Sequence, residues 1–305
     1  MNELEKILRY FSSDICEFII NVIKNDSKII NDIREIRIRV GKPIILKLKN
    51  DDIVLRYTVS QQEILKILEK FCENSIYAYK NQICNGFLTI RGGHRIGICG
   101  TVVIENNEIV NIKYISSLNV RIAREILNCS NQMLKEILDI QNHTIYNTLI
   151  VSPPGKGKTT VLRDIVRQIS NGIPNYFKPM TVGLVDERGE IAASYRGIPQ
   201  NDVGIRTDVI GNVNKSKGIE MLIRTMAPEV IACDEIGLKD DVDAIRKTFV
   251  SGVKGIFTMH GKNLEDIKNN KEISELIESK RIEKIIFIWL ILNSKFKIII
   301  YNFKF

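Results

Sequence analysis

The stretch that decides the fold of the larger part of this chain is Ser152-Pro153-Pro154-Gly155-Lys156-Gly157-Lys158-Thr159-Thr160. It lies between an apolar run of strand length at residues 146–151 and residues 161–169, where apolar residues repeat at helical spacing. A phosphate-binding loop needs glycines, which let backbone N–H groups converge on anionic oxygens, and the start of a helix, whose dipole adds positive potential. Gly155 and Gly157 meet the first need, and a helix from about Lys158 meets the second. The sequence therefore predicts a P-loop with a nucleoside triphosphate as its ligand.

Two side chains of this loop carry the expected chemistry. Lys158 is expected to reach the β- and γ-phosphates of ATP, and the hydroxyl of Thr159 is expected to bind Mg²⁺. Ser152 stands where the strict pattern has glycine, and the Pro153-Pro154 pair makes a defined turn beside it. We expect the whole of residues 152–160 to bind the nucleotide.

A second, acidic element is required, because Mg²⁺ and the attacking water both need carboxylates beside the phosphate. The run Val230-Ile231-Ala232-Cys233-Asp234-Glu235 supplies it, since a buried strand ends there in two acidic residues. Asp234 is expected to hold Mg²⁺ through water, and Glu235 to polarise the nucleophilic water.

The run Val185-Asp186-Glu187-Arg188 offers another carboxylate at the end of another expected strand. Open parallel sheets place their ligands at this edge, so Glu187 is a rival catalytic base; the alternative is that it forms a surface ion pair with an arginine. The run Thr258-Met259-His260-Gly261 ends a further strand, and His260 is either a sensor near the γ-phosphate or a structural histidine.

Charge that develops on the γ-phosphate is commonly neutralised by an arginine, in many ring ATPases one from a neighbouring subunit. Arg206, in Gly204-Ile205-Arg206-Thr207-Asp208, is our candidate for this role. Arg224, Arg95 and Arg121 are further candidates, and the sequence does not rank them securely. For each, the alternative is a structural ion pair or a solvated charge.

The pattern along the chain predicts two domains and a linker. Residues 1–125 mix short helices (4–11, 15–23 and 64–71) with strands (36–40, 44–46, 86–90 and 95–103), as in a smaller N-terminal α+β domain. Residues 126–144, helical and polar at the end, are expected to be the linker. From residue 145 to residue 305 strands (146–151, 181–185, 230–233 and 255–259) alternate with helices (161–169, 218–226 and 242–250), which predicts an α/β domain with a mostly parallel sheet.

Composition and charge indicate the cellular environment of the chain but not its function. The 44 basic and 36 acidic residues give a net charge of +8, which favours anionic partners or simply reflects a solvated basic surface. The six cysteines show no metal-ligand spacing and are expected to be reduced thiols, most of them buried. The start is acidic where a secretory signal would be basic, and the apolar run 285–292, followed by 298–300, is better explained by a buried hairpin than by a membrane span. We therefore expect a cytoplasmic protein, attached to a membrane only peripherally.

Several motifs in combination resemble the stage III sporulation protein AA family. They are Gly92-Gly93-His94-Arg95-Ile96-Gly97, Asp186-Glu187-Arg188-Gly189-Glu190-Ile191, Arg206-Thr207-Asp208-Val209 and Ile223-Arg224-Thr225-Met226-Ala227-Pro228-Glu229-Val230-Ile231. The resemblance runs from about residue 34 to about residue 261, and the Asn- and Lys-rich tail beyond it does not match the family residue by residue.

The family is similar to the ATPases of type II and type IV secretion and of pilus motors. The resemblance implies a RecA-like P-loop core, an N-terminal domain packed on it, and a ring that is a homo-hexamer. By position, Asp186-Glu187 resembles the acidic box of the secretion relatives and residues 258–261 resemble their histidine box. The resemblance further implies ATP turnover that powers a channel complex between mother cell and forespore, with membrane-embedded channel components as partners on the mother-cell side.

Three functions are therefore compared. The first is a Mg²⁺-dependent ATPase that works as such a motor. The second is a nucleic-acid-directed ATPase, a loader or translocase, suggested by the +8 charge and the RecA-like core. No basic and aromatic strip that would stack single-stranded bases is evident, so we expect no direct binding of nucleic acid. The third is a scaffold that uses ATP only to fix its oligomeric state.

Overall fold

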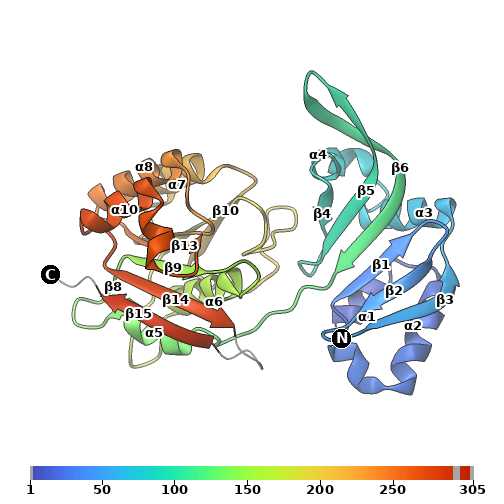
Figure 1. Cartoon of the computed structure of the whole chain (residues 1–305), viewed down its shortest axis with the longest axis horizontal. Coiled ribbons are helices and arrows are strands. Elements are labelled where there is room, and N and C mark those ends of the chain that lie inside the picture. The colour runs from blue at the N-terminus through green and yellow to red at the C-terminus, as the bar shows by residue number, and fades with distance from the viewer. Residues whose placement is uncertain (1–2, 291–295, 303–305) are drawn as a thin grey trace. The chain divides into compact units, whose positions relative to one another are not determined.

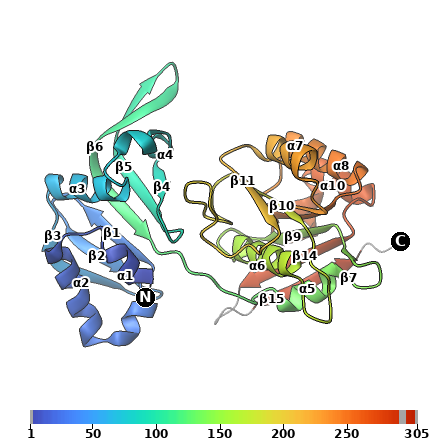
Figure 2. The same cartoon turned by 180° about the vertical axis from the view of Figure 1, so that it is seen from behind.

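The computed structural model describes residues 3–290 and 296–302 of the chain. It divides the chain into two compact units, Met1–Arg124 and Glu125–Phe305. Each unit has its own main sheet, as Figure 1 and the reverse view in Figure 2 show.

The first unit is built on a six-stranded antiparallel sheet with the order β3-β2-β1-β6-β5-β4. The strands are β1 Glu35–Arg39, β2 Pro43–Lys47, β3 Asp52–Thr58, β4 Phe87–Thr89, β5 Arg95–Glu105 and β6 Glu108–Arg121. Strand β1 shows how the sequence pattern sets the faces, because Ile36 and Ile38 are fully buried and the alternating charged residues are not. This unit is the α+β domain that the sequence predicts.

Serine side chains cap the N-termini of two helices of this unit. The helices of the unit are α1 Glu3–Leu8, α2 Ser13–Asn25, α3 Gln61–Phe71 and α4 Lys80–Cys84, with short 3₁₀ turns at η1 Ser27–Asn31 and η2 Ile76–Tyr79. Helix α3 begins with a capping box, in which the side chains of Ser60 and Glu63 each accept a hydrogen bond from the other residue's backbone N–H. Four apolar residues of α3 are buried, so its apolar face packs into the core of the unit.

Residues 126–144 are part of the second unit and not the linker that the sequence suggested. They form helix α5 Asn131–Ile137 and the short strands β7 Leu138–Asp139 and β8 Thr144–Ile145. Met133, Leu134 and Ile137 are buried in the core of this unit. The segment before α5 is also fixed, because the buried carboxylate of Asp164 accepts hydrogen bonds from the backbone N–H groups of Asn128 and Ser130.

The second unit is built on a seven-stranded sheet with the order β11-β10-β12-β13-β9-β14-β15, parallel except for β15. The strands are β9 Thr148–Ser152, β10 Val182–Asp186, β11 Thr207–Gly211, β12 Val230–Cys233, β13 Lys254–His260, β14 Lys284–Leu290 and β15 Phe296–Asn302. The four strands predicted from the sequence are confirmed. Strand β11 was not predicted, because its residues are only half-buried at the edge of the sheet and lack an apolar run.

Helices cover both faces of this sheet. Helix α6 Lys158–Asn171 contributes to one buried cluster together with α5. Helices α7 Lys215–Met226, α8 Lys239–Val250, α9 Leu264–Lys268 and α10 Lys271–Glu278 contribute to the cluster on the other face. An apolar sheet covered on both faces is the arrangement that the alternating strand and helix pattern predicts.

The C-terminal hairpin completes the sheet. Strand β14 runs parallel to β9, and β15 runs antiparallel to β14. The predicted strand pair is therefore confirmed, but only β14 is buried, because every residue of β15 is half-buried or exposed. The expected turn at residues 293–295 lies outside the described residues. No helix within residues 3–290 and 296–302 combines the length and the apolar character that a membrane span needs.

Candidate nucleotide-binding site

The loop between β9 and α6 has the backbone of a phosphate cradle. Ser152 is buried at the end of β9, and Gly155 and Gly157 adopt φ angles of 70° and 91°, a region that side chains disfavour. Helix α6 begins at Lys158 without a side-chain cap and without an acidic residue in its first turn. Its positive end is therefore not compensated by the protein's own carboxylates in that turn, which suits an anionic ligand.

Lys158 folds back over this loop. Its side-chain ammonium donates hydrogen bonds to the carbonyl oxygen of Ser152 at 3.2 Å and to Nδ1 of His260 at 2.8 Å. Burial lowers the pKa of Lys158, and the carboxylates of Asp234 and Glu235 oppose that shift. Because an ammonium group can only donate, Nδ1 of His260 accepts and the ring proton lies on Nε2.

The predicted magnesium ligands meet at the start of helix α6. The Thr159 hydroxyl donates to Oδ2 of Asp234 at 2.5 Å, while the Thr258 hydroxyl donates to Oδ1 of the same carboxylate. A hydroxyl and a carboxylate side by side fit Mg²⁺, which prefers oxygen ligands and is commonly held by few protein groups together with phosphate and water. Among the residues that the structure describes, no three His, Cys, Asp or Glu side chains converge as an all-protein metal site.

Glu235 is fixed from several sides. Its backbone adopts a φ of 55°, in the left-handed region, and its N–H donates to the Thr258 hydroxyl at 2.9 Å. Its side chain accepts from Nε2 of His260 at 2.8 Å and from the guanidinium of Arg188 at 2.5 Å. The structure thus brings Lys158, His260 and Glu235 into one hydrogen-bonded chain, with His260 in the middle.

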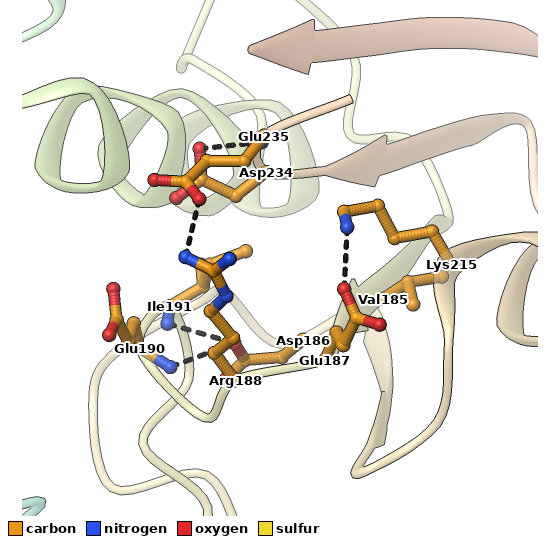
Figure 3. A pocket seen from close by; sticks show the side chains of 9 residues that line it. All are labelled: Val185, Asp186, Glu187, Arg188, Glu190, Ile191, Lys215, Asp234 and Glu235. Atoms are coloured by element: carbon orange, nitrogen blue, oxygen red, sulfur yellow. Dashed lines mark hydrogen bonds and ion pairs between the residues drawn. The ribbon is translucent and has the colours of Figure 1, made fainter. Parts of the chain in front are cut away.

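The carboxylates of the neighbouring acidic pocket have different hydrogen-bond partners (Figure 3). Asp186 is buried and accepts backbone N–H groups of Glu190, Ile191 and Ala192, so it fixes the loop after β10. Burial raises the pKa of Asp186, and these backbone hydrogen bonds oppose that shift. These contacts assign Asp186 a structural role in the loop.

Glu187 points to Lys215, and Glu235 points to Arg188 (Figure 3). The Lys215 side chain is only 10% exposed, and its pair with Glu187 offsets the cost of burial and raises the pKa of Lys215. Glu187 thus has a buried cation as its partner. Glu235 instead adjoins the pair formed by Thr159 and Asp234 through the shared contact with Thr258.

Arg206 lies at the opposite ends of the strands from the P-loop. It precedes Thr207 at the amino end of β11, whereas the loop, Asp186, Asp234 and His260 lie at the carboxyl ends of their parallel strands. Arg206 is exposed, and its guanidinium donates to the backbone oxygen of Ser170 at 3.4 Å.

The other candidate arginines lie elsewhere. Arg224 is exposed in the last turn of α7. Arg95 and Arg121 face each other in the first unit, where the Arg95 guanidinium lies over the ring of Phe87 and Arg121 pairs weakly with Glu35.

Sequence reasoning assigned no catalytic or binding role to three side chains at the site. Arg188 follows the candidate base Glu187 in the sequence, and Thr258 lies two residues before His260. This closeness in sequence was the signal that could have identified them. Lys215 carried no signal, because the chain between Glu187 and Lys215 includes a whole strand and only the fold brings them together.

Sheet order, phosphate loop and acidic strand ends together define a RecA-like P-loop nucleotide-binding fold, in a chain that also has a separate α+β domain. The ATPase DotB of Yersinia pseudotuberculosis shares this fold, with a TM-score of 0.60 and 14% identity over 96% of this chain and 80% of that one. The pilus retraction motor PilT, solved with bound ADP, is similar with a TM-score of 0.57 and 14% identity over 92% of this chain and 81% of that one. The predicted fold class is confirmed.

The chain belongs to the family described as "Sporulation stage III, protein AA", which it matches over residues 1–298. Stage III sporulation protein AA of Bacillus subtilis is 38% identical over 253 residues, which are 83% of this chain and 81% of the relative. The family that the sequence motifs resemble is therefore the family of this chain.

Proposed function

We propose that this protein is a Mg²⁺-dependent ATPase. The observation that carries the proposal is the contact between Thr159 and Asp234 at 2.5 Å, beside a P-loop and next to Glu235. A loop that only packed against the sheet would not need a metal-binding hydroxyl, a matching carboxylate and a second carboxylate at this one place.

The residues divide the work as follows in this proposal. The backbone of residues 152–160 and the ammonium of Lys158 bind the phosphates of ATP, and Thr159 and Asp234 hold Mg²⁺, which neutralises phosphate charge. Glu235 orients and polarises the attacking water. His260 links the phosphate-binding Lys158 to the base Glu235, because its ring contacts both side chains.

Glu235 is a better base than Glu187 on this geometry. Glu187 is engaged by the buried Lys215, whereas Glu235 shares Thr258 with the carboxylate that faces Thr159. We assign Glu187 the role of fixing Lys215 and the acidic wall of the pocket.

A ring assembly, which we take to be a homo-hexamer, gives Arg206 its role. Arg206 is exposed at the amino ends of the strands, whereas the P-loop lies at their carboxyl ends. Because of this separation, Arg206 can act only on a nucleotide bound to a neighbouring subunit. The fold shared with DotB and PilT supports a motor of this type.

The biological task we propose is to power a channel complex between mother cell and forespore. Membership of the sporulation family supports it, and the partners would be membrane-embedded components on the mother-cell side. The protein would then work in the cytoplasm, at the membrane.

Hydrolysis of ATP by the purified protein in Mg²⁺ tests the proposal. Lys158→Ala should reduce hydrolysis at least about 100-fold, whereas Lys178→Ala, at an exposed lysine away from the loop, should hydrolyse like the wild type. Hydrolysis that is equal in all three proteins, or absent from the wild type even with its membrane partners, would sink it. Salt-sensitive stimulation by DNA or RNA would favour a nucleic-acid-directed ATPase instead.

A further inference from the structure

Thr258 is a polar residue in an otherwise apolar, buried stretch of β13. It lies between Phe257 and Met259 and has no exposed surface. Strands β12 and β9 flank β13 on its two sides, so the residue sits in the middle of the sheet. A hydroxyl buried this deeply requires hydrogen-bond partners.

Its partners are three consecutive residues at the acidic turn after β12. The hydroxyl donates to Oδ1 of Asp234 and accepts the backbone N–H of Glu235 at 2.9 Å. The carbonyl oxygen of Thr258 accepts the N–H of Ile236 at 2.8 Å. The direction of each bond is fixed, because a carboxylate can only accept and a backbone N–H can only donate.

These contacts set both carboxylates that the proposed reaction uses. Asp234 lies between two hydroxyls, Thr258 on Oδ1 and Thr159 on Oδ2, so its orientation is determined. Glu235 adopts a left-handed backbone, which a non-glycine residue keeps only where its surroundings hold it, and Thr258 bonds its N–H.

A comparison within the same unit shows that burial alone does not explain these contacts. Thr248 is also fully buried, but its hydroxyl donates to the carbonyl oxygen of Ala244 one turn back in helix α8, at 2.9 Å. Its hydroxyl thus contacts no acidic residue, whereas that of Thr258 contacts two neighbouring ones.

From these contacts we propose that Thr258 is a positioning residue of the ATPase site, one that aligns Asp234 for Mg²⁺ and Glu235 for the attacking water. The inference rests on the proposed ATPase function. It adds a residue that acts through the two carboxylates without touching the nucleotide.

The test compares Thr258→Val, which loses the hydroxyl at nearly constant volume, with Thr258→Ser, which keeps it, and with Thr248→Val as the matched control. The first readout is the Mg²⁺ concentration that gives half-maximal binding of a fluorescent ATP analogue. It should rise about 10-fold or more in Thr258→Val and stay near wild type in the other two. The second is hydrolysis, in which kcat of Thr258→Val should fall about 10- to 100-fold while KM for ATP changes little.

Wild-type Mg²⁺ dependence in Thr258→Val would overturn the proposal, as would an equal change in Thr248→Val. If Thr258→Val does not fold, Thr258→Ala and Thr258→Ser make the same comparison, since these two differ only by the hydroxyl. If the wild type does not hydrolyse ATP, the proposed function fails, and the Mg²⁺ titration by itself decides whether Thr258 positions Asp234.

Discussion

The guanidinium of Arg188 lies 2.5 Å from the carboxylate of Glu235. The Arg188 side chain is 62% exposed, so an isolated surface pair of this kind would contribute little to stability. Its partner, however, is the carboxylate to which we assign the attacking water. The contact therefore matters for the direction in which Glu235 points more than for the stability of the fold.

Arg188→Ala should lower kcat about 10-fold or more and leave the unfolding temperature nearly unchanged, because it removes one of the two side chains that orient Glu235. Steady-state hydrolysis and thermal unfolding measure the two effects. Arg281→Ala, at an exposed arginine of the same unit, is the control. A kcat that is unchanged or higher would show that Arg188 does not orient the base.

Glu187→Gln should reduce stability more than activity. It leaves the buried ammonium of Lys215 without its carboxylate, a change that costs about 1–3 kcal/mol of unfolding free energy. Adding Lys215→Met should recover part of this loss, which a double-mutant cycle in urea unfolding measures. Hydrolysis within about threefold of wild type is expected for Glu187→Gln; loss of activity with full stability would make Glu187 the base instead.

Arg206→Ala should abolish most hydrolysis, because the nucleotide site of each subunit then lacks the arginine that its neighbour supplies. Mixing Arg206→Ala subunits with Lys158→Ala subunits should then restore activity, since some interfaces combine an intact P-loop with an intact arginine. A mixture of Lys158→Ala with Glu235→Gln should stay inactive, because both changes damage the site of their own chain. Mixtures that stay inactive in both cases would place the role of Arg206 within its own subunit.

His94 makes the first unit sensitive to acid. Burial lowers the pKa of His94 to about 4, against the opposing charge of Glu3, and its Nδ1 accepts the N–H of Ala123. Between pH 6.5 and 4 the unfolded chain binds the proton more readily than the folded chain. The free energy of unfolding therefore decreases by about 3 kcal/mol in total as the pH is lowered from 6.5 to 4. His94→Gln should remove this dependence, and the exposed His143→Gln should keep it. Urea unfolding at pH 7 and pH 4 measures the difference, and an equal loss in wild type and His94→Gln would contradict this account.

The sequence predicts the parts of the site that are local in the chain. Gly155, Gly157 and Lys158 belong to one loop, and Asp234 and Glu235 end one strand, so spacing alone brought out both elements. The structure then places Thr159 against Asp234 without any change to these predictions.

The remainder depends on contacts between distant segments. Lys215 meets Glu187 only because β11 crosses to the edge of the sheet, and Thr258 meets Asp234 only because β13 lies beside β12. The linker prediction failed for a similar reason. Met133 and its neighbours in α5 gain a core to pack against only from the sheet of the second unit.

The measurement that tests the central claim most directly is single-turnover hydrolysis of bound ATP in Mg²⁺ by wild type and Glu235→Gln, with Glu265→Gln at an exposed glutamate as control. The nucleotide recovered from the protein shows whether binding and hydrolysis separate. We predict that Glu235→Gln binds ATP within about threefold of wild type but converts it to ADP at least about 100-fold more slowly. ADP formed at the wild-type rate in Glu235→Gln would contradict the assignment of this site as the place where ATP is hydrolysed.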